Sequence, residues 1–178
     1  MSFRTASICL LVLIPWAAQA ESMNHAADSI PAESGQAAFA AIAEVVAFLE
    51  TDPGTDWARV DIGALQAHLA DMDAVVLHSR VVEAAIEGGL EMTITGDGPV
   101  GDAIQRMVTA HAPELNALAG FTAVAEAFEG GAVLRVTGDG EGLQHRIRAL
   151  GFYGLLATGA HHQAHHLAIA SGHGPHDH

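Results

Sequence analysis

The chain has 178 residues, enough for one compact domain, and a net charge of −14 at pH 7 that comes from 21 acidic residues against seven arginines. This charge repels nucleic-acid backbones and anionic lipid surfaces, and therefore argues against both as partners. The one cysteine, Cys9, lies in a segment that we expect to be removed, which leaves no cysteine for disulfides, iron–sulfur clusters or zinc.

The start of the chain predicts a secretory signal peptide over residues 1–20. Arg4 supplies an early positive charge, residues 8–16 are apolar, and small residues precede a cleavage site after Ala20. The apolar run is about half as long as a bilayer-spanning helix requires. We therefore expect export to the periplasm or the extracellular space, and a disordered linker over 21–34.

Two helices are predicted before the first strand. Residues 35–49 are rich in alanine, with apolar residues at helical spacing, and residues 62–78 continue this pattern after the turn TDPGTDW.

An internal repeat follows these helices. The segment EGGLEMTITGDG (87–98) recurs as EGGAVLRVTGDG (129–140), which indicates a duplication. Apolar residues alternate on both sides of each Gly-Gly pair, so each copy predicts a β-hairpin with its turn at that pair. The Gly-Asp-Gly elements favour side-chain capping of the next helix over phosphate binding, because their central residue is acidic.

Helices at 100–118 and 142–170 complete the predicted order α-α-ββ-α-ββ-α. Two hairpins with one apolar face each can form a four-stranded antiparallel sheet packed by helices. The predicted class is α+β, a duplicated hairpin-helix (ββα) unit preceded by two N-terminal helices. Residues 35–172 would form a single domain with repeats over about 67–109 and 110–170, followed by a His-rich disordered tail at 173–178.

Several histidines recur with the duplication. His68 in AHLADMDAV and His111 in AHAPELNAL occupy equivalent places, 43 residues apart. His161 in AHHQAHHLA follows His111 by 50 residues, and the seven extra residues are close to two helical turns. These three histidines should therefore converge with His165, which lies one turn beyond His161.

Each of the three helices offers two donors four residues apart. Side chains at this spacing lie about 5–6 Å from each other on one helix face, close enough to bind one ion. His162 and His166 lie about 100° further round their helix, which predicts solvent-facing or supporting positions. The three pairs are His68 with Met72, Met107 with His111, and His161 with His165.

The predicted site would hold copper or zinc, with copper favoured. Imidazole suits both ions, whereas thioether sulfur from Met72 or Met107 favours Cu(I). A set completed by Asp71, Asp73 or Glu114 would favour zinc or another borderline ion.

The motif HHQAH together with the upstream AHLADM resembles the three-histidine arrangement of DinB-like metalloproteins. Members of that family are four-helix bundles that hold a divalent metal. The resemblance covers these two motifs and implies His68, His161 and His165 as the ligands.

These observations favour an exported metal-binding protein that sequesters, carries or senses copper or zinc. Two alternatives stay open: a metal-dependent hydrolase-like protein with the DinB-like site, and a non-enzymatic repeat scaffold or interaction protein. A hydrolase needs an open metal position and a general base, for which Asp71, Asp73 and Glu114 are candidates.

Overall fold

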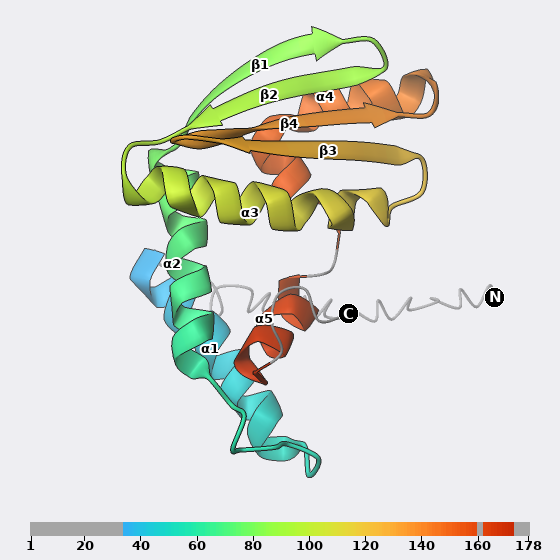
Figure 1. The fold of residues 1–178 in the computed structure, drawn as a ribbon. Helices are drawn as coiled ribbons and strands as arrows, with labels where there is room; N and C mark the ends of the chain where they lie inside the picture. The colour runs from blue at the N-terminus through green and yellow to red at the C-terminus, as the bar shows by residue number, and fades with distance from the viewer. Residues whose placement is uncertain (1–33, 160–161, 173–178) are drawn as a thin grey trace, which may run out of the picture. The chain divides into compact units, whose positions relative to one another are not determined.

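The computed structural model describes residues 34–159 and 162–172, whose helices and strands are drawn in Figure 1. The expected signal peptide, nearly all of the expected linker and the expected tail lie outside these residues. No helix within them is both long enough and apolar enough to cross a membrane. In chain order the elements are α1 (Ser34–Thr51), α2 (Ile62–His78), β1 (Arg80–Ile86), β2 (Gly89–Thr95), α3 (Pro99–Asn116), β3 (Phe121–Phe128), β4 (Gly131–Gly138), α4 (Gly140–Leu156) and α5 (His162–Ala170).

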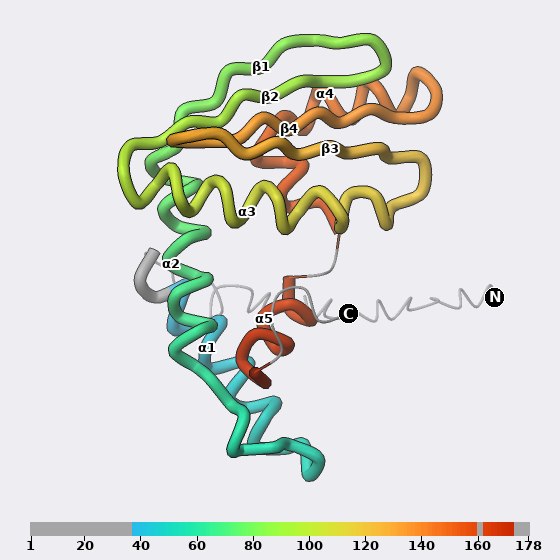
Figure 2. The backbone as a smooth tube through the Cα atoms, viewed as in Figure 1, coloured from blue at the N-terminus to red at the C-terminus, as the bar shows by residue number. Residues whose placement is uncertain are grey.

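The four strands form one antiparallel sheet in the order β1-β2-β4-β3, which Figure 2 follows along the backbone. The two central strands pair so that Leu90 lies opposite Val136 and Met92 lies opposite Leu134. All four side chains are buried, because alternate residues of a strand point to the same face. The predicted α+β class, with a four-stranded antiparallel sheet packed by helices, is therefore confirmed.

The internal duplication appears in the hydrogen bonds that join the two hairpins. The backbone N–H of Gly96 donates to the carbonyl oxygen of Gly130, and that of Gly138 donates to the carbonyl oxygen of Gly88, each at 3.0 Å. The two donors are equivalent residues of the repeat, and so are the two acceptors. Each hairpin thus donates one hydrogen bond to the turn of the other hairpin, from the same position of the repeat.

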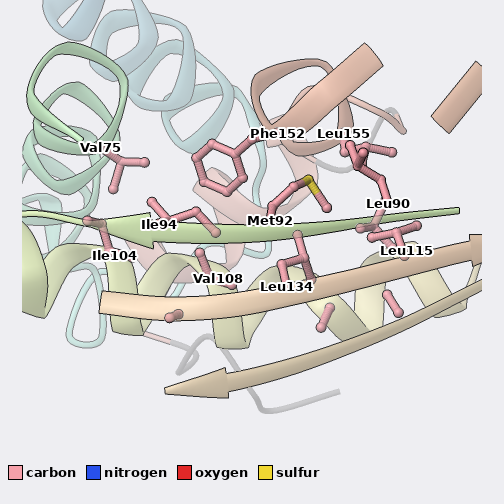
Figure 3. Packing of buried hydrophobic residues seen from close by; sticks show 14 of the residues in the cluster. Val75, Leu90, Met92, Ile94, Ile104, Val108, Leu115, Leu134, Phe152 and Leu155 are labelled. Carbon is pink, nitrogen blue, oxygen red and sulfur yellow. The ribbon is translucent and has the colours of Figure 1, made fainter. Parts of the chain in front are cut away.

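The main core lies between the sheet and the helices α3 and α4. Figure 3 shows Phe152 and Leu155 of α4 and Ile104 and Val108 of α3 around the inward side chains of the strands. Burying apolar surface, at about 25 cal/mol per Å², is the dominant favourable contribution to folding. A second, smaller cluster joins α1, α2 and α5, and its buried members are Val45, Leu49, Leu65, Leu69, Ile169 and Ala170.

Helix α2 belongs to both clusters. Val75, near its C-terminal end, is buried in the main core, whereas Leu65 and Leu69, nearer its start, are buried with residues of α1 and α5. The middle of α2, which carries His68, therefore lies where the two clusters meet.

The hairpin turns lie one residue earlier than predicted. They are formed by Glu87-Gly88 and Glu129-Gly130, so the second glycine of each pair is the first residue of β2 or β4. Gly88 and Gly130 have φ angles of 75° and 81°, which L side chains rarely adopt. The first glycine of each pair is thus required by the turn, and the second by the sheet.

The Gly-Asp-Gly elements begin α3 and α4 without the predicted side-chain caps. At the start of α3, the N–H of Val100 instead donates to the backbone carbonyl oxygen of Asp97 at 3.2 Å. A backbone turn therefore replaces the expected carboxylate cap.

The helix predicted over 142–170 is in fact two helices, α4 and α5. Within α4, Gly151 has φ 57° and ψ −166°, which interrupts the helical geometry. The carboxylate of Glu83 in β1 accepts a hydrogen bond from the N–H of Phe152 at 2.9 Å, as an N-cap residue does. The last turn of α4 is thus a separately capped segment.

The two central strands approach each other too closely at Gly131 for any other residue. A Cβ there would collide with the carbonyl oxygen of Ile94, whereas a Cβ at Gly142, an exposed helical position, would meet nothing within 4 Å. Gly131→Ala should therefore lower the free energy of unfolding by about 1–3 kcal/mol or more. Gly142→Ala should raise it by about 0.5–1 kcal/mol through helix propensity. Urea denaturation of both variants measures the difference, and equal stabilities would contradict the close approach.

Candidate metal centre

Four histidines from α2 and α5 form a cluster between these helices. The ring centroid of His68 lies 4.9 Å from that of His165 and 5.5 Å from that of His166, in edge-to-face orientation. His162 extends the cluster, with its ring centroid 6.2 Å from that of His166. Two imidazoles on one tetrahedral ion, with metal–nitrogen bonds of about 2.0–2.1 Å, have centroids roughly 5 Å apart. The observed spacing of His68 to its two neighbours is close to that value.

The sequence of α5 explains why its histidines turn inward. His162, His165 and His166 follow the i, i+3, i+4 spacing of a helix face, and Ile169 continues it at i+7. Ile169 is buried in the smaller cluster with residues of α1 and α2. The apolar contact at the end of α5 therefore directs the three histidines of the same face towards α2.

The Nε2 atoms of His68 and His166 are buried and have no hydrogen-bond partner among the described residues. Leaving a buried polar group unpaired costs about 1–3 kcal/mol, so such groups are rare in folded proteins. Two of them in one cluster call for a physical explanation.

Both of these histidines are neutral at pH 7. Burial, helped by the nearby rings of His165 and His166, lowers the pKa of His68 to about 4, although Asp71 acts in the opposite direction. Burial, followed by the charges of His162 and His165, also lowers the pKa of His166. Neutral imidazole is the form that binds metal ions, and the lowered pKa values of His68 and His166 favour that form at neutral pH.

Two more histidines are held by the last carbonyl groups of α4. Nε2 of the buried His111 lies 2.9 Å from the carbonyl oxygen of Leu155, and Nε2 of His162 lies 3.1 Å from that of Leu156. A carbonyl oxygen only accepts, so each Nε2 carries the hydrogen and the lone pair of the neutral ring is on Nδ1. Histidines that bind metals usually donate their other N–H to such a group, which fixes the ring orientation.

A cleft of about 30 Å³ opens onto these side chains between α2, α3 and α5. This volume is enough for an ion or for one or two water molecules. The lining residues are His68, Met107, Ala110, His111, Glu114, His162 and His165.

The structure brings together four of the six predicted ligands, because His68, His111, His165 and Met107 all line this cleft. Met72 lines a neighbouring apolar cavity instead. The sixth predicted ligand, His161, lies outside the described residues.

The sequence predicted solvent-facing or supporting positions for His162 and His166 of α5. His162 lines the cleft, and His166 is buried against His68 rather than facing solvent. The signal that identifies them is their spacing from Ile169, three residues beyond His166 and seven beyond His162.

Of the acidic residues near the cleft, Asp71 is already engaged. Its two carboxylate oxygens accept hydrogen bonds from the Nε and Nη2 atoms of Arg106, each at 2.8 Å. Glu114 lines the cleft and is therefore the better placed carboxylate.

In the part of the chain that the structure describes, no three histidine, aspartate or glutamate side chains are already arranged to hold an ion. Coordination would therefore require some rings to rotate. An unfavourable side-chain rotamer costs about 0.5–1.5 kcal/mol.

No protein family, curated protein or solved structure matches this chain. The resemblance to DinB-like metalloproteins rests on two histidine motifs, and the four-stranded sheet distinguishes this fold from a four-helix bundle.

Metal-free protein should become less stable as the pH falls from about 6.5 towards 4. The pKa of His68 is lower in the folded chain than in the unfolded chain, so the unfolded chain binds more protons in this window. His68→Gln should reduce the loss by roughly 1–3 kcal/mol, a range that allows for partial solvent exposure of the ring. Urea unfolding at about pH 7 and about pH 4.5, with a chelator present, measures the effect.

The exposed His145 of α4 provides the matched control. His145→Gln should leave the pH dependence as it is in the wild type. If the free energy of unfolding changed with pH equally in the wild type and the His68 variant, burial would not lower the pKa of His68.

Proposed function

We propose that the protein is an exported metal-binding protein that holds a copper or zinc ion between α2, α3 and α5. The observation that carries this proposal is the pair of buried Nε2 atoms of His68 and His166, unpartnered among the described residues and set in one cluster of imidazoles. A bound ion is one of the partners that could make such a cluster favourable, because coordination replaces the missing hydrogen bonds.

His68 and His165 are the central ligands in this proposal. They come from different helices, and their ring centroids lie 4.9 Å apart. His111 and His162 are the candidates to complete the set, because both line the cleft and α4 carbonyl groups hold both rings in place. His166, whose buried Nε2 has no partner among the described residues, and His161, predicted from the sequence, are further candidate ligands.

Copper is the preferred ion and zinc the second choice. A site of imidazole nitrogens and a carboxylate binds Cu(II) more tightly than Zn(II), by the general order of divalent affinities. Met107 at the same cleft adds a thioether, which suits Cu(I). Such a site in an exported chain would serve to sequester, carry or sense the ion.

The first test is metal binding by the full chain, purified without an added tag. Replacing both His68 and His165 by Gln should weaken the tightest copper or zinc site by on the order of 100-fold or more, because two ligands are lost. Equilibrium dialysis followed by elemental analysis measures this loss. The matched control replaces His78 and His145, both exposed, by Gln and should bind like the wild type.

All variants keep the C-terminal histidines, so metal capture by the tail is the same in each. Wild-type affinity in the His68/His165 double variant would overturn the proposal. An absence of tight binding in the wild type would favour the scaffold alternative, and metal-dependent hydrolysis of a model ester would favour the hydrolase.

The two methionines distinguish Cu(I) from other ions. Met107 lines the histidine cleft, whereas Met72 lines only the apolar cavity beside it. Met107→Leu should weaken Cu(I) binding by roughly tenfold and leave Zn(II) binding nearly unchanged, because zinc has little affinity for thioethers. Met72→Leu should affect neither ion. Competition with a Cu(I) chelator measures both variants, and equal effects of the two would exclude a thioether ligand from Met107.

A further inference from the structure

An apolar cavity lies directly beside the histidine cleft. It has a volume of about 240 Å³, is partly open to solvent, and is lined by residues of α2, α3, the end of α4 and the start of α5. An engineered apolar cavity of about 150 Å³ is large enough to bind benzene. This cavity can therefore hold a ring with a further substituent.

The cavity and the cleft share three residues, Met107, His111 and His162. The two spaces therefore adjoin along one wall, and that wall carries the two histidines that the end of α4 holds in place.

The rest of the cavity is almost entirely apolar. Val75 is buried in its wall, Val76 is exposed at its rim, and Leu156 closes it from α4. The hydroxyl groups of Tyr153 and Ser79 are hydrogen-bonded to each other at 3.1 Å. The cavity is thus apolar apart from His111, His162 and Tyr153, the pattern of a small-molecule site with few polar groups.

The charge of the protein restricts the class of ligand. A net charge of −14 at pH 7 disfavours an anion, and the apolar walls disfavour a second charged or strongly polar group. A neutral, chiefly aromatic molecule fits these conditions, and one nitrogen lone pair would let it bind the proposed ion of the adjoining cleft.

We propose that this cavity binds a neutral aromatic azole or amine. Its nitrogen would coordinate the metal ion where the cavity adjoins the cleft, beside His111 and His162. This inference rests on the proposed metal site. His68, His165 and one histidine of the shared wall would then hold the ion, and the nitrogen of the ligand would occupy the remaining coordination position.

The test uses the full chain loaded with Co(II), whose visible spectrum reports changes in coordination. Imidazole is compared with a phenyl-substituted imidazole, which carries the same donor and an apolar ring. The phenyl-substituted probe should bind more tightly by on the order of tenfold or more, because its ring is buried in the cavity.

Two variants locate the binding. Ala157 is exposed and lines the cavity, so Ala157→Phe should fill it and abolish the preference for the phenyl-substituted probe. Ala149 is exposed on α4 and does not line the cavity, so Ala149→Phe should keep the preference. The two probes differ in basicity, but this difference is the same in every variant. Comparing the ratio of the two affinities between variants therefore removes it.

The outcomes separate this inference from the proposed function. The ligand site is overturned if the Co(II)-loaded chain binds both probes equally, or if the Ala157 variant keeps the preference for the phenyl-substituted probe. Either result is compatible with the proposed metal site. A chain that gives no Co(II) spectrum before any probe is added overturns both.

Discussion

Glu83 fixes the direction of the last turn of α4, on which the candidate site depends. Its carboxylate accepts a hydrogen bond from the N–H of Phe152, directly after the non-helical Gly151. Any larger residue at that glycine would be strained, since its φ is 57° and a Cβ would lie 2.7 Å from a Glu83 oxygen. The capped turn ends in the two carbonyl groups that hold the rings of His111 and His162. A capping interaction at the edge strand β1 is thus connected through one helical turn to the histidine cleft.

The duplication builds a symmetric sheet, yet the site is not symmetric. His68 and His111 are the histidines that the sequence pairs between the two repeats, and both line the cleft. Their helices nevertheless pack differently, because α3 lies along the sheet whereas α2 continues into the smaller cluster with α1 and α5. The histidine-rich α5 has no counterpart after the first repeat. The cleft therefore forms where the symmetric part of the fold meets its unrepeated part.

The position of the site between two cores has an energetic consequence. The smaller cluster has few buried apolar residues, and two buried ring nitrogens beside it are without partners among the described residues. Each such nitrogen costs about 1–3 kcal/mol, a large part of the net stability of a small domain. Binding of an ion by the folded chain alone would offset this cost and join α2 to α5. We therefore expect metal binding and the packing of α5 to be coupled.

The sequence by itself determined the fold class and most of the elements, because alternation, helical spacing and the repeated Glu-Gly-Gly segments are local signals. It also singled out His68, His111 and His165, since duplication and helix period are visible in one dimension. Only the tertiary structure decided that Met107 rather than Met72 lines the cleft, and that His166 is buried. Those outcomes depend on the face of α5 that packs against α2. The burial of Ile169 determines that face. The same outcomes depend equally on the direction of the last turn of α4, which a carboxylate 69 residues earlier in the chain fixes by a hydrogen bond.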